Sequence, residues 1–403
     1  MSDPGDVVNS VFREEWPRVV ASLARRFGDL DIAEEAAGEA FVAAVEHWRG
    51  GIPPNPGGWL MTTASRKAID RLRRESRRDQ KHEEAAMLAS PPAPTGVVED
   101  DQLRLMFVCC HPALAPEARV ALTLRMVGGL TVAEIARAFL VPETTIAQRI
   151  TRAKRKVREA RVAFRLPDRD DLVERVGGVL SVLYLVFNEG YLAGAGDEPI
   201  RVELTDEAIR LTRLLHDLLP ADGEVVGLLA LMLLIESRRL ARTDDEGELL
   251  TLDEQDRSLW NTRLVAEGQS LVLARIATGE PPGPYQLQAA INAVHTAAAT
   301  FADTDWAQLS RLYDDLYALM PTPVVALNRA IVRAELAGAE PALAEIDALG
   351  LDGYHAWHAS RADLLRRLGR HDEARAAYAR AIETTGNAAE ARLLSRRMAG
   401  LPA

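Results

Sequence analysis

The sequence predicts an all-α protein, in which two small helical domains are followed by a longer all-helical extension. Apolar residues recur every three or four positions through most of the 403 residues, as they do along amphipathic helices. No stretch of useful length shows the alternation that is typical of a strand. A Pro- and Ala-rich segment, residues 90–96, separates the first helices from the rest, and its composition predicts a flexible linker.

Charge is distributed unevenly along the chain, which carries a net charge of −11. Residues 1–165 carry 25 Lys and Arg against 22 Asp and Glu, whereas the remainder carries 23 against 37. An acidic surface repels DNA, so we expect the second part to face protein or solvent. The asymmetry therefore predicts two functional halves.

Cysteine usage and hydropathy exclude several classes of protein. Cys109 and Cys110 are the only cysteines, which rules out a disulfide framework and suits a reducing cytoplasm. They could form half of a metal site with His111, but no second ligand pair has zinc-like spacing, so a structural role is favoured and no metal or cofactor is expected. The N-terminal residues lack the basic-then-apolar pattern of a signal peptide, so none is expected. The longest apolar run, residues 225–235, is far shorter than the roughly 20 residues of a membrane span.

Residues 130–161 predict a helix-turn-helix. Thr131 can cap a first helix, because Glu134 follows at the spacing of a capping box. Pro142 ends that helix and suits the first turn of the next. The second helix buries Ile146, Ile150, Ala153 and Val157, and presents a polar face made of Thr145, Gln148, Arg149, Arg152 and Lys156. Such a helix lies in the DNA major groove, where Arg and Gln read base edges. The alternative is a helical hairpin with a solvated basic face.

A second basic helix is predicted upstream, in residues 58–81. Its apolar face is formed by Leu60, Ala64, Ala68 and Leu72, and Trp59 stands at its entrance. The rest of its surface is largely basic, through Arg66, Lys67, Arg71, Arg73, Arg74, Arg77 and Arg78. This combination suits contact with the DNA backbone and stacking of bases on the aromatic ring. The alternative is a solvated basic helix with a core Trp.

The first helical region covers about residues 7–49. Gly28 is expected to end the first helix. In the second helix Ala36, Ala40 and Phe41 face inward, while Glu35 and Glu39 lie on one exposed edge. This acidic edge is either a solvated surface or a docking face for a basic partner.

Taken in order, these segments resemble the extracytoplasmic-function (ECF) branch of the sigma-70 family of RNA polymerase sigma factors. The matching stretches are DLDIAEEAAGEAFVAA (29–44), NPGGWLMTTASRKAIDRLRR (55–74) and LAPEARVALTLRMVGGLTVAEIARAFLVPETTIAQRITRAKRKVRE (114–159). The resemblance implies sigma region 2 at 1–78, a linker at 79–101 and sigma region 4 at 102–166. The implied partners are promoter DNA and core RNA polymerase, contacted through its β′ coiled coil and β flap.

The resemblance also implies roles for individual residues. Those expected to contact the β′ coiled coil are Glu34, Glu35, Glu39 and Phe41. Those expected to capture and open the minus-ten element are Trp59, Arg66, Lys67, Asp70, Arg71 and Arg74. Those expected on the minus-35 recognition helix are Glu143, Thr144, Thr145, Gln148, Arg149, Arg152 and Lys156. The family often has Asn at the position of Arg66 and Gly at that of Thr144, differences that bear on promoter preference and not on the class.

Residues 167–403 resemble the C-terminal helical extension that one subgroup of the family carries. LSVLYLVFNEGYLA (180–193) resembles its start, and LLRRLGRHDEARAAYARAIETTGNAAEARLL (364–394) is similar to a tetratricopeptide (TPR) repeat. In that repeat the small and large residues expected to let paired helices pack are Gly369, Ala374, Tyr378, Ala381 and Ile382. TPR-like repeats are therefore expected near 323–399. Further helices are expected at 204–219, 222–242, 253–277, 284–300 and 304–320.

Two groups in the extension are candidates for a specific site. The best polar candidate is the run Asn188, Glu189, Gly190 and Tyr191, for which the alternative is a helix C-cap with Gly190 in the left-handed conformation. His355 and His358 have a spacing that two metal ligands could use, but no third ligand lies nearby in the sequence, so a structural role is favoured.

The sequence therefore predicts a sigma factor whose extension regulates it, either by docking on the DNA-binding faces or by binding a separate protein. The alternative is a helix-turn-helix operator-binding regulator with a helical-repeat sensor or partner domain. That alternative needs neither the acidic edge at 29–44 nor the basic helix. An enzyme with a DNA-binding appendage is disfavoured, because no paired carboxylates, nucleophile elbow or phosphate loop is present.

Overall fold

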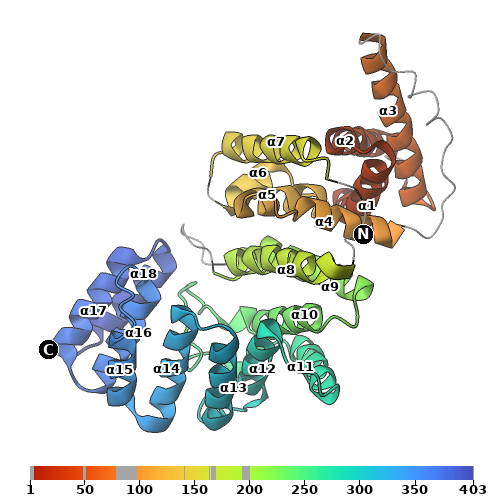
Figure 1. Ribbon diagram of the computed structural model, residues 1–403. Helices are drawn as coiled ribbons and strands as arrows, with labels where there is room; N and C mark the ends of the chain where they lie inside the picture. The colour runs from red at the N-terminus through yellow and green to blue at the C-terminus, as the bar shows by residue number, and fades with distance from the viewer. Residues whose placement is uncertain are drawn as a thin grey trace. The chain divides into compact units, whose positions relative to one another are not determined.

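The structure, a computed structural model, describes residues 4–48, 51–78, 98–139, 141–162, 164, 169–192 and 200–402. Helices account for most of these residues, and the described part of the chain holds no strand beyond a single bridge between Thr243 and Leu249. The all-α prediction is confirmed. The chain divides into two compact units, residues 1–185 and 186–403 (Figure 1).

The first unit contains seven helices within its described residues, and an eighth crosses its boundary. They are α1 (Pro4–Phe27), α2 (Leu30–His47), α3 (Pro56–Arg78), α4 (Val98–Cys109), α5 (Pro116–Met126), α6 (Val132–Ala138), α7 (Glu143–Glu159) and α8 (Arg169–Tyr191). Gly28, with φ +67°, ends α1 as predicted. The Asp29 side chain then caps α2 by accepting from the amide of Asp31 at 2.7 Å. Residues 79–97 of the expected linker lie outside the described residues, and its last four are the first turn of α4.

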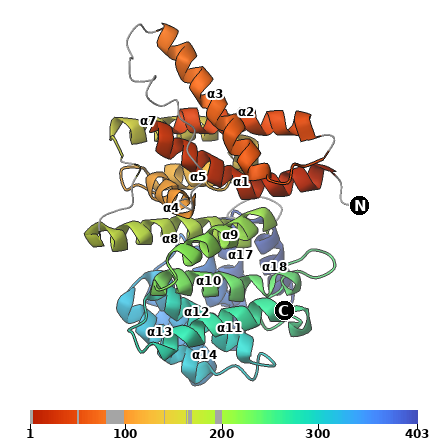
Figure 2. The same ribbon diagram turned by 90° about the vertical axis from the view of Figure 1, so that its right-hand side faces the viewer.

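Helices α1, α2 and α3 pack around one apolar core. Trp16 is fully buried, and its ring lies 5.1 Å from that of Phe12 and 5.8 Å from that of Phe41. Most residues predicted to face inward from α2 and α3 are buried, namely Ala36, Ala40, Phe41, Leu60, Ala64 and Ala68, whereas Leu72 is only half-buried. Figures 1 and 2 both show α3 extending beyond α1 and α2 at its C-terminal end.

The helix-turn-helix is formed by α6 and α7. The amide of Thr131 donates to Glu134 Oε2 at 2.7 Å, and the amide of Glu134 donates to Thr131 Oγ1 at 3.1 Å, which confirms the capping box. Pro142 is the N-cap of α7 and so precedes its first turn by one residue. The predicted apolar face of α7 is buried, at Ile146, Ile150, Ala153 and Val157.

In the second unit the described helices follow one another as a series of packed neighbours. They are α9 (Val202–Leu218), α10 (Gly223–Glu236), α11 (Thr262–Ala277), α12 (Pro284–Ala297), α13 (Trp306–Leu319), α14 (Pro323–Ala337), α15 (Ala339–Asp347), α16 (His355–Arg367), α17 (His371–Thr384) and α18 (Ala388–Ala399). Ala374, Tyr378 and Ala381 of α17 are buried, and Ile382 is half-buried against the same apolar cluster. Gly369, with φ +73°, makes the turn between α16 and α17. None of the helices built from described residues has the length and hydropathy to cross a membrane.

Two predicted helices of the extension are much shorter than expected, whereas the ends of the others differ by only a few residues. The helix predicted at 222–242 ends at Glu236, and the one predicted at 253–277 begins only at Thr262. The cause is a contact between them, in which the amide of Asn261 donates to the Ser237 carbonyl at 2.7 Å. The Asn261 side chain then caps α11 by accepting from the amides of Arg263 and Leu264. The intervening chain forms two short 3-10 turns, at Arg239–Ala241 and Arg257–Leu259.

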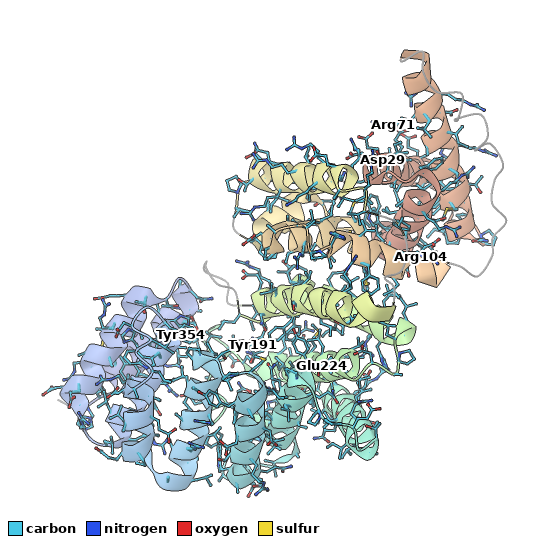
Figure 3. All side chains as sticks on the ribbon, in the orientation of Figure 1. Asp29, Arg71, Arg104, Tyr191, Glu224 and Tyr354 are labelled. Atoms are coloured by element: carbon cyan, nitrogen blue, oxygen red, sulfur yellow. The ribbon has the colours of Figure 1, made fainter. Side chains whose placement is uncertain are left out.

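The polar run Asn188–Tyr191 ends α8 and fastens it to the helices that follow. Gly190 lies within α8 and has no left-handed conformation, so the alternative of a C-cap at this glycine is wrong. Its carbonyl accepts from the amide of Arg201 at 2.7 Å, and a Cβ added there would lie 2.6 Å from the Thr205 nitrogen. Glu189 pairs with Arg201 at 2.5 Å. The ring of Tyr191, labelled in Figure 3, lies 3.5 Å below the Arg242 guanidinium. These contacts are internal to the second unit.

Gly190→Ala should destabilise the chain by about 1–3 kcal/mol, because the added methyl group would force α9 away from α8. Gly177→Ala, on the same helix, is the matched control. A Cβ there would meet no atom within 4 Å, so the higher helix propensity of Ala should leave stability unchanged or raise it by up to about 1 kcal/mol. Urea unfolding followed by circular dichroism compares the two, and equal midpoints would contradict the close approach of α8 and α9.

Candidate functional site

The exposed face of α7 presents the residues predicted for the minus-35 element. Gln148, Arg152 and Lys156 are exposed and follow one another at intervals of four residues, with Glu143 and Thr144 exposed at the start of the helix. Thr145 and Arg149 are half-buried beside them. Within the described part of the chain Arg149, Arg152 and Lys156 form no ion pair. This row is therefore open to a nucleic-acid backbone or to base edges.

The predicted minus-ten residues fall into two rows on α3. Arg66, Asp70 and Arg74 are exposed at intervals of four residues. Lys67 and Arg71 instead pair with α2. Lys67 Nζ lies 3.3 Å from Glu39 Oε2. Arg71, labelled in Figure 3, pairs with Glu35. The structure thus separates a solvent-exposed row from a row that pairs with α2.

Trp59 is half-buried at the start of α3. Its ring lies 5.4 Å from that of Trp48 and 5.9 Å from that of His47. Sequence analysis did not single out Trp48 or His47. A half-exposed aromatic cluster at the foot of a basic helix retains the capacity for base stacking.

The residues predicted for core-polymerase contact occupy three different environments on α2. Glu35 and Glu39 are exposed and pair with α3, as described above. Val42 and Val45 continue this edge as exposed apolar residues, and sequence analysis missed them although their helical spacing from Glu35 and Glu39 was available as a signal. Phe41 lies in the aromatic core and supports α2 from beneath, so it does not offer a surface to a partner.

Glu34 lies in a cluster of ion pairs that joins α2 to α5 and α7. We call this cluster the α2 clamp and define it as Asp31, Glu34, Arg125, Lys154 and Arg158. Glu34 accepts from both Arg125 and Lys154, and Lys154 Nζ also lies 3.0 Å from Asp31 Oδ1. Arg158 pairs with Asp31. The side chains of Lys154 and Glu34 are only 9% and 14% exposed. Neither Arg125 nor Lys154 was singled out in the sequence.

Two further contacts hold the clamp in place. The Arg125 guanidinium lies 5.0 Å from the centroid of the Trp16 ring, and Trp16 Nε1 donates to the Arg125 carbonyl at 3.2 Å. Gly129, with φ +75°, follows α5, and a Cβ added there would lie 3.1 Å from the same ring. The loop after α5 therefore approaches the core of α1–α3 directly.

Electrostatics favour the ionised form of Glu34. Burial raises the pKa of its carboxyl, but the charges and hydrogen bonds of Lys154 and Arg125 outweigh burial and leave the pKa below its usual value. A carboxylate buried among cations is stable only while those cations remain in place. Glu34 therefore makes the contact between α2 and α7 depend on ionic partners.

The cysteine and histidine residues that were considered as metal ligands do not form a metal site within the described residues. Burial raises the pKa of the Cys110 thiol to about 11, and its Sγ lies 3.4 Å from Thr123 Oγ1. Burial likewise raises the pKa of Cys109. His355 Nε2 lies 3.3 Å from a Glu390 oxygen, whereas His358 Nε2 bonds the Asp352 carbonyl. Among the described residues no group of three or more His, Cys, Asp or Glu is arranged to hold a metal ion.

Comparison with known proteins decides between a sigma factor and an operator-binding regulator. Residues 11–78 match the family described as Sigma-70 region 2, and residues 104–157 match Sigma-70, region 4. The chain is also 31% identical over 150 residues to the ECF RNA polymerase sigma factor SigK of Mycobacterium ulcerans, covering 35% of this chain and 78% of that protein. The chain belongs to the ECF sigma factors. This sigma factor directs core RNA polymerase to specific promoters and initiates transcription, so its partners are core polymerase and promoter DNA.

Other similarities cover different shares of the chain. An uncharacterized protein of Rhizobium meliloti is 44% identical over 386 residues, 93% of this chain and 91% of its own length. Residues 175–276 match a family of unknown function, DUF6596. A probable ECF sigma factor of Mycobacterium tuberculosis, SigI, is 29% identical over 165 residues, 39% of this chain and 57% of its own.

One solved structure is similar, a thermophilic TPR protein in Thermus thermophilus. It is 21% identical and covers 50% of this chain and 91% of its own length, with a TM-score of 0.34. In the extension itself, each described helix from α9 to α18 packs against the next one along the chain.

Lys154→Ala should weaken the α2 clamp, because Glu34 would keep only Arg125 in a largely buried position. Removing one partner of a buried pair costs roughly 3–5 kcal/mol, and with Arg125 remaining we expect about 1–3 kcal/mol. Hydrogen exchange of the α2 and α7 amides in the full chain measures the loss. Arg155→Ala is the control, because Arg155 is 65% exposed on the same helix and pairs within the described residues only with Glu159.

The pH dependence of this effect has a definite sign. Because the folded pKa of Glu34 is lowered, its contribution is fully present above the usual Glu value of about 4.3 and is lost as the pH falls through the lowered pKa. The difference between Lys154→Ala and wild type should therefore shrink at low pH. A difference that grew as the pH fell would contradict an ionised Glu34.

Proposed function

We propose that the free sigma factor is held closed by the α2 clamp and must open to initiate transcription. The observation that supports this proposal is that both DNA-facing helices are ion-paired to α2. The minus-ten helix α3 pairs through Lys67 and Arg71, and the minus-35 helix α7 pairs through Lys154 and Arg158. In this arrangement α3 and α7 are both held beside α2.

Promoter geometry requires a larger separation. The minus-ten and minus-35 elements lie about 25 base pairs apart, which is roughly 85 Å at about 3.4 Å per base pair. Helix α2 has 18 residues and is therefore only roughly 27 Å long. The two elements thus lie about three times the length of α2 apart. On this proposal the clamp breaks so that region 4 can reach the upstream element.

Opening also exposes a surface for polymerase. In the proposed open form Asp31 and Glu34 lose their cations and join Glu35 and Glu39 on α2. With the exposed Val42 and Val45, they would form an acidic and apolar face suited to the β′ coiled coil. Region 4, once released, would contact the β flap.

On this proposal Lys154→Ala binds core polymerase more tightly than wild type, whereas Arg155→Ala does not. Unchanged affinity of Lys154→Ala would reject competition between clamp and polymerase.

We propose that the exposed row on α3, with Trp59 at its foot, captures the minus-ten strand. Opening a promoter draws bases out of the stack, and an aromatic cluster beside cations can hold them. Arg66 and Arg74 would contact the backbone, and Trp59 would stack on a freed base. The exposed face of α7 would read the minus-35 element in the major groove.

Arg149→Ala should relax discrimination at one base position of the minus-35 element, by roughly 1–3 kcal/mol if Arg149 contacts a guanine in bidentate fashion. Lys156→Ala is the comparison variant, since an exposed lysine that contacts only phosphate should weaken binding to all sequences alike and reduce the salt dependence. Binding of the holoenzyme to a promoter set with single-base changes measures both. A uniform loss with Arg149→Ala would make it a phosphate contact.

We further propose that the acidic extension regulates promoter output. The support is the charge division, because the sequence beyond residue 165 holds 37 acidic against 23 basic residues and so disfavours DNA as its partner. Its partner would be another protein or the basic helices α3 and α7 of the same chain.

Deleting residues 193–403, which leaves α8 whole, should change the amount of transcript made with core polymerase in vitro. Circular dichroism must first show that the shortened chain retains its helices. Docking on the DNA-binding helices predicts more transcript and tighter DNA binding after deletion, whereas a required activating contact predicts less. Transcription equal to that of the full chain would remove the regulatory proposal.

A further inference from the structure

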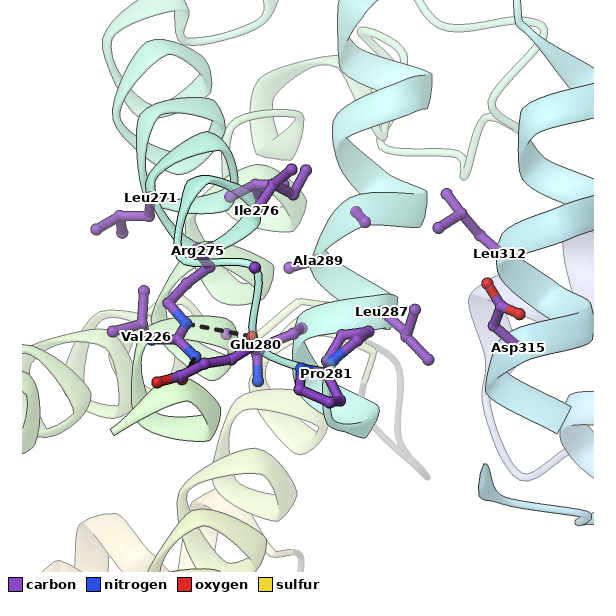
Figure 4. Close-up of a pocket in the computed structure, with 17 residues that line it drawn as sticks. Val226, Leu271, Arg275, Ile276, Glu280, Pro281, Leu287, Ala289, Leu312 and Asp315 are labelled. Atoms are coloured by element: carbon purple, nitrogen blue, oxygen red, sulfur yellow. Dashed lines mark hydrogen bonds and ion pairs between the residues drawn. The ribbon is translucent and has the colours of Figure 1, made fainter. Parts of the chain in front are cut away.

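The second unit contains a cavity of about 390 Å³ between α10, α11, α12 and α13 (Figure 4). Its walls are mostly aliphatic and include Leu271 and Ile276 from α11, Leu287 from α12 and Leu312 from α13. Small-molecule pockets occupy roughly 300–1,000 Å³, so this cavity lies at the lower end of that range. Ile276 is two-thirds exposed at its rim, which leaves apolar surface available to an occupant.

The cavity exists because small residues line its floor. Ala230 of α10 and Ala289 and Ala290 of α12 contribute only methyl groups to the wall. Gly227 lets the two helices approach, since a Cβ there would lie 2.6 Å from the Gln286 nitrogen. Larger residues at these positions would fill the space or separate the helices.

One end of the cavity carries a cation whose partner is exchangeable. The Arg275 side chain is only 14% exposed, and its Nη2 donates to Glu280 Oε2 at 2.6 Å. Glu280 itself is 65% exposed. An ion pair whose carboxylate lies in water contributes little to stability. A ligand carboxylate could therefore replace Glu280 while Arg275 stays paired. Arg275 Nε also donates to Gln286 Oε1 at 3.3 Å, which fixes the guanidinium toward the cavity.

The other charged groups near the cavity limit the ligand to a single negative charge. Glu224 is already engaged, because it accepts from the amides of Tyr285 at 3.0 Å and Gln286 at 3.3 Å. Asp315 lines the opposite wall on α13, away from Arg275 in Figure 4. These two carboxylates would repel a second anionic group, so polyphosphates and nucleotides are disfavoured.

We infer that this cavity binds an amphipathic monocarboxylate, with its carboxylate on Arg275 in place of Glu280 and its apolar body against Leu271, Ile276 and Leu287. Through this site the extension would bind small molecules of that class. The inference does not rest on the promoter roles proposed above, because binding is measured without DNA or polymerase.

Calorimetric titration of the full chain with decanoate tests the site, with decanol and decylammonium as probes of equal length and different charge. We expect saturable binding of one decanoate per chain, weaker binding of decanol and weakest binding of decylammonium. Absence of saturable decanoate binding, or tighter binding of decylammonium, would overturn the inference.

Two variants at the ion pair should act in opposite directions. Arg275→Gln should weaken decanoate binding about tenfold or more without changing decanol binding, because it removes only the charged contact. Glu280→Gln should strengthen decanoate binding, because it removes the competing carboxylate. If the pair served only the fold, both variants would act alike, and that result would reject the site.

Two further variants complete the test. Arg263→Gln removes an exposed arginine on the same helix, outside the cavity, and should leave the decanoate affinity unchanged. Ala290→Phe should abolish binding of both decanoate and decanol by filling the cavity. Thermal unfolding of each variant identifies any that fail to fold, and the opposite shifts at Arg275 and Glu280 decide the outcome if Ala290→Phe is among them.

Discussion

The carboxylate of Glu34, enclosed by Arg125 and Lys154, is the interaction on which the arrangement of the first unit depends. A charge removed from water is tolerated only beside opposite charges, so region 4 must stay on region 2 for as long as Glu34 stays buried. An ionic contact of this kind differs from an apolar one. Another charged partner can replace it, and its separation exposes groups that water solvates well. It therefore suits a contact that has to be made and broken.

Local features of the structure could be predicted from the sequence, because they depend on residues close together in the chain. The capping box at Thr131, the buried stripe of α7 and the end of α1 at Gly28 each depend on spacings of seven residues or fewer. The α2 clamp joins Glu34 to residues 91 and 120 positions away, which no periodicity reveals. One signal was present, since Lys154 stands among Ile150, Ala153 and Val157 where an apolar residue is expected.

The predictions that were wrong in the extension were also wrong because contacts between residues far apart in the sequence decide the structure there. The run after Glu236 favours a helix by its composition, but α10 ends there because the Ser237 carbonyl bonds a residue 24 positions further on. Gly190 suggested a helix cap, since glycine commonly ends helices in the left-handed conformation. Its actual role is to let two backbones touch, and the partner helix was not identifiable from the run itself. The candidate site on α7 was accessible to sequence reasoning because its polar and apolar faces share one helical period.

The two native thiols have a practical consequence for observing this protein at work. Cys109 and Cys110 are both fully enclosed, and burial keeps each of them protonated far above neutral pH. The folded chain therefore offers almost no background reaction to maleimide dyes. A pair of cysteines introduced on the outer surfaces of α2 and α7 would carry donor and acceptor fluorophores selectively. Single-molecule energy transfer could then follow the spacing of the two regions in real time.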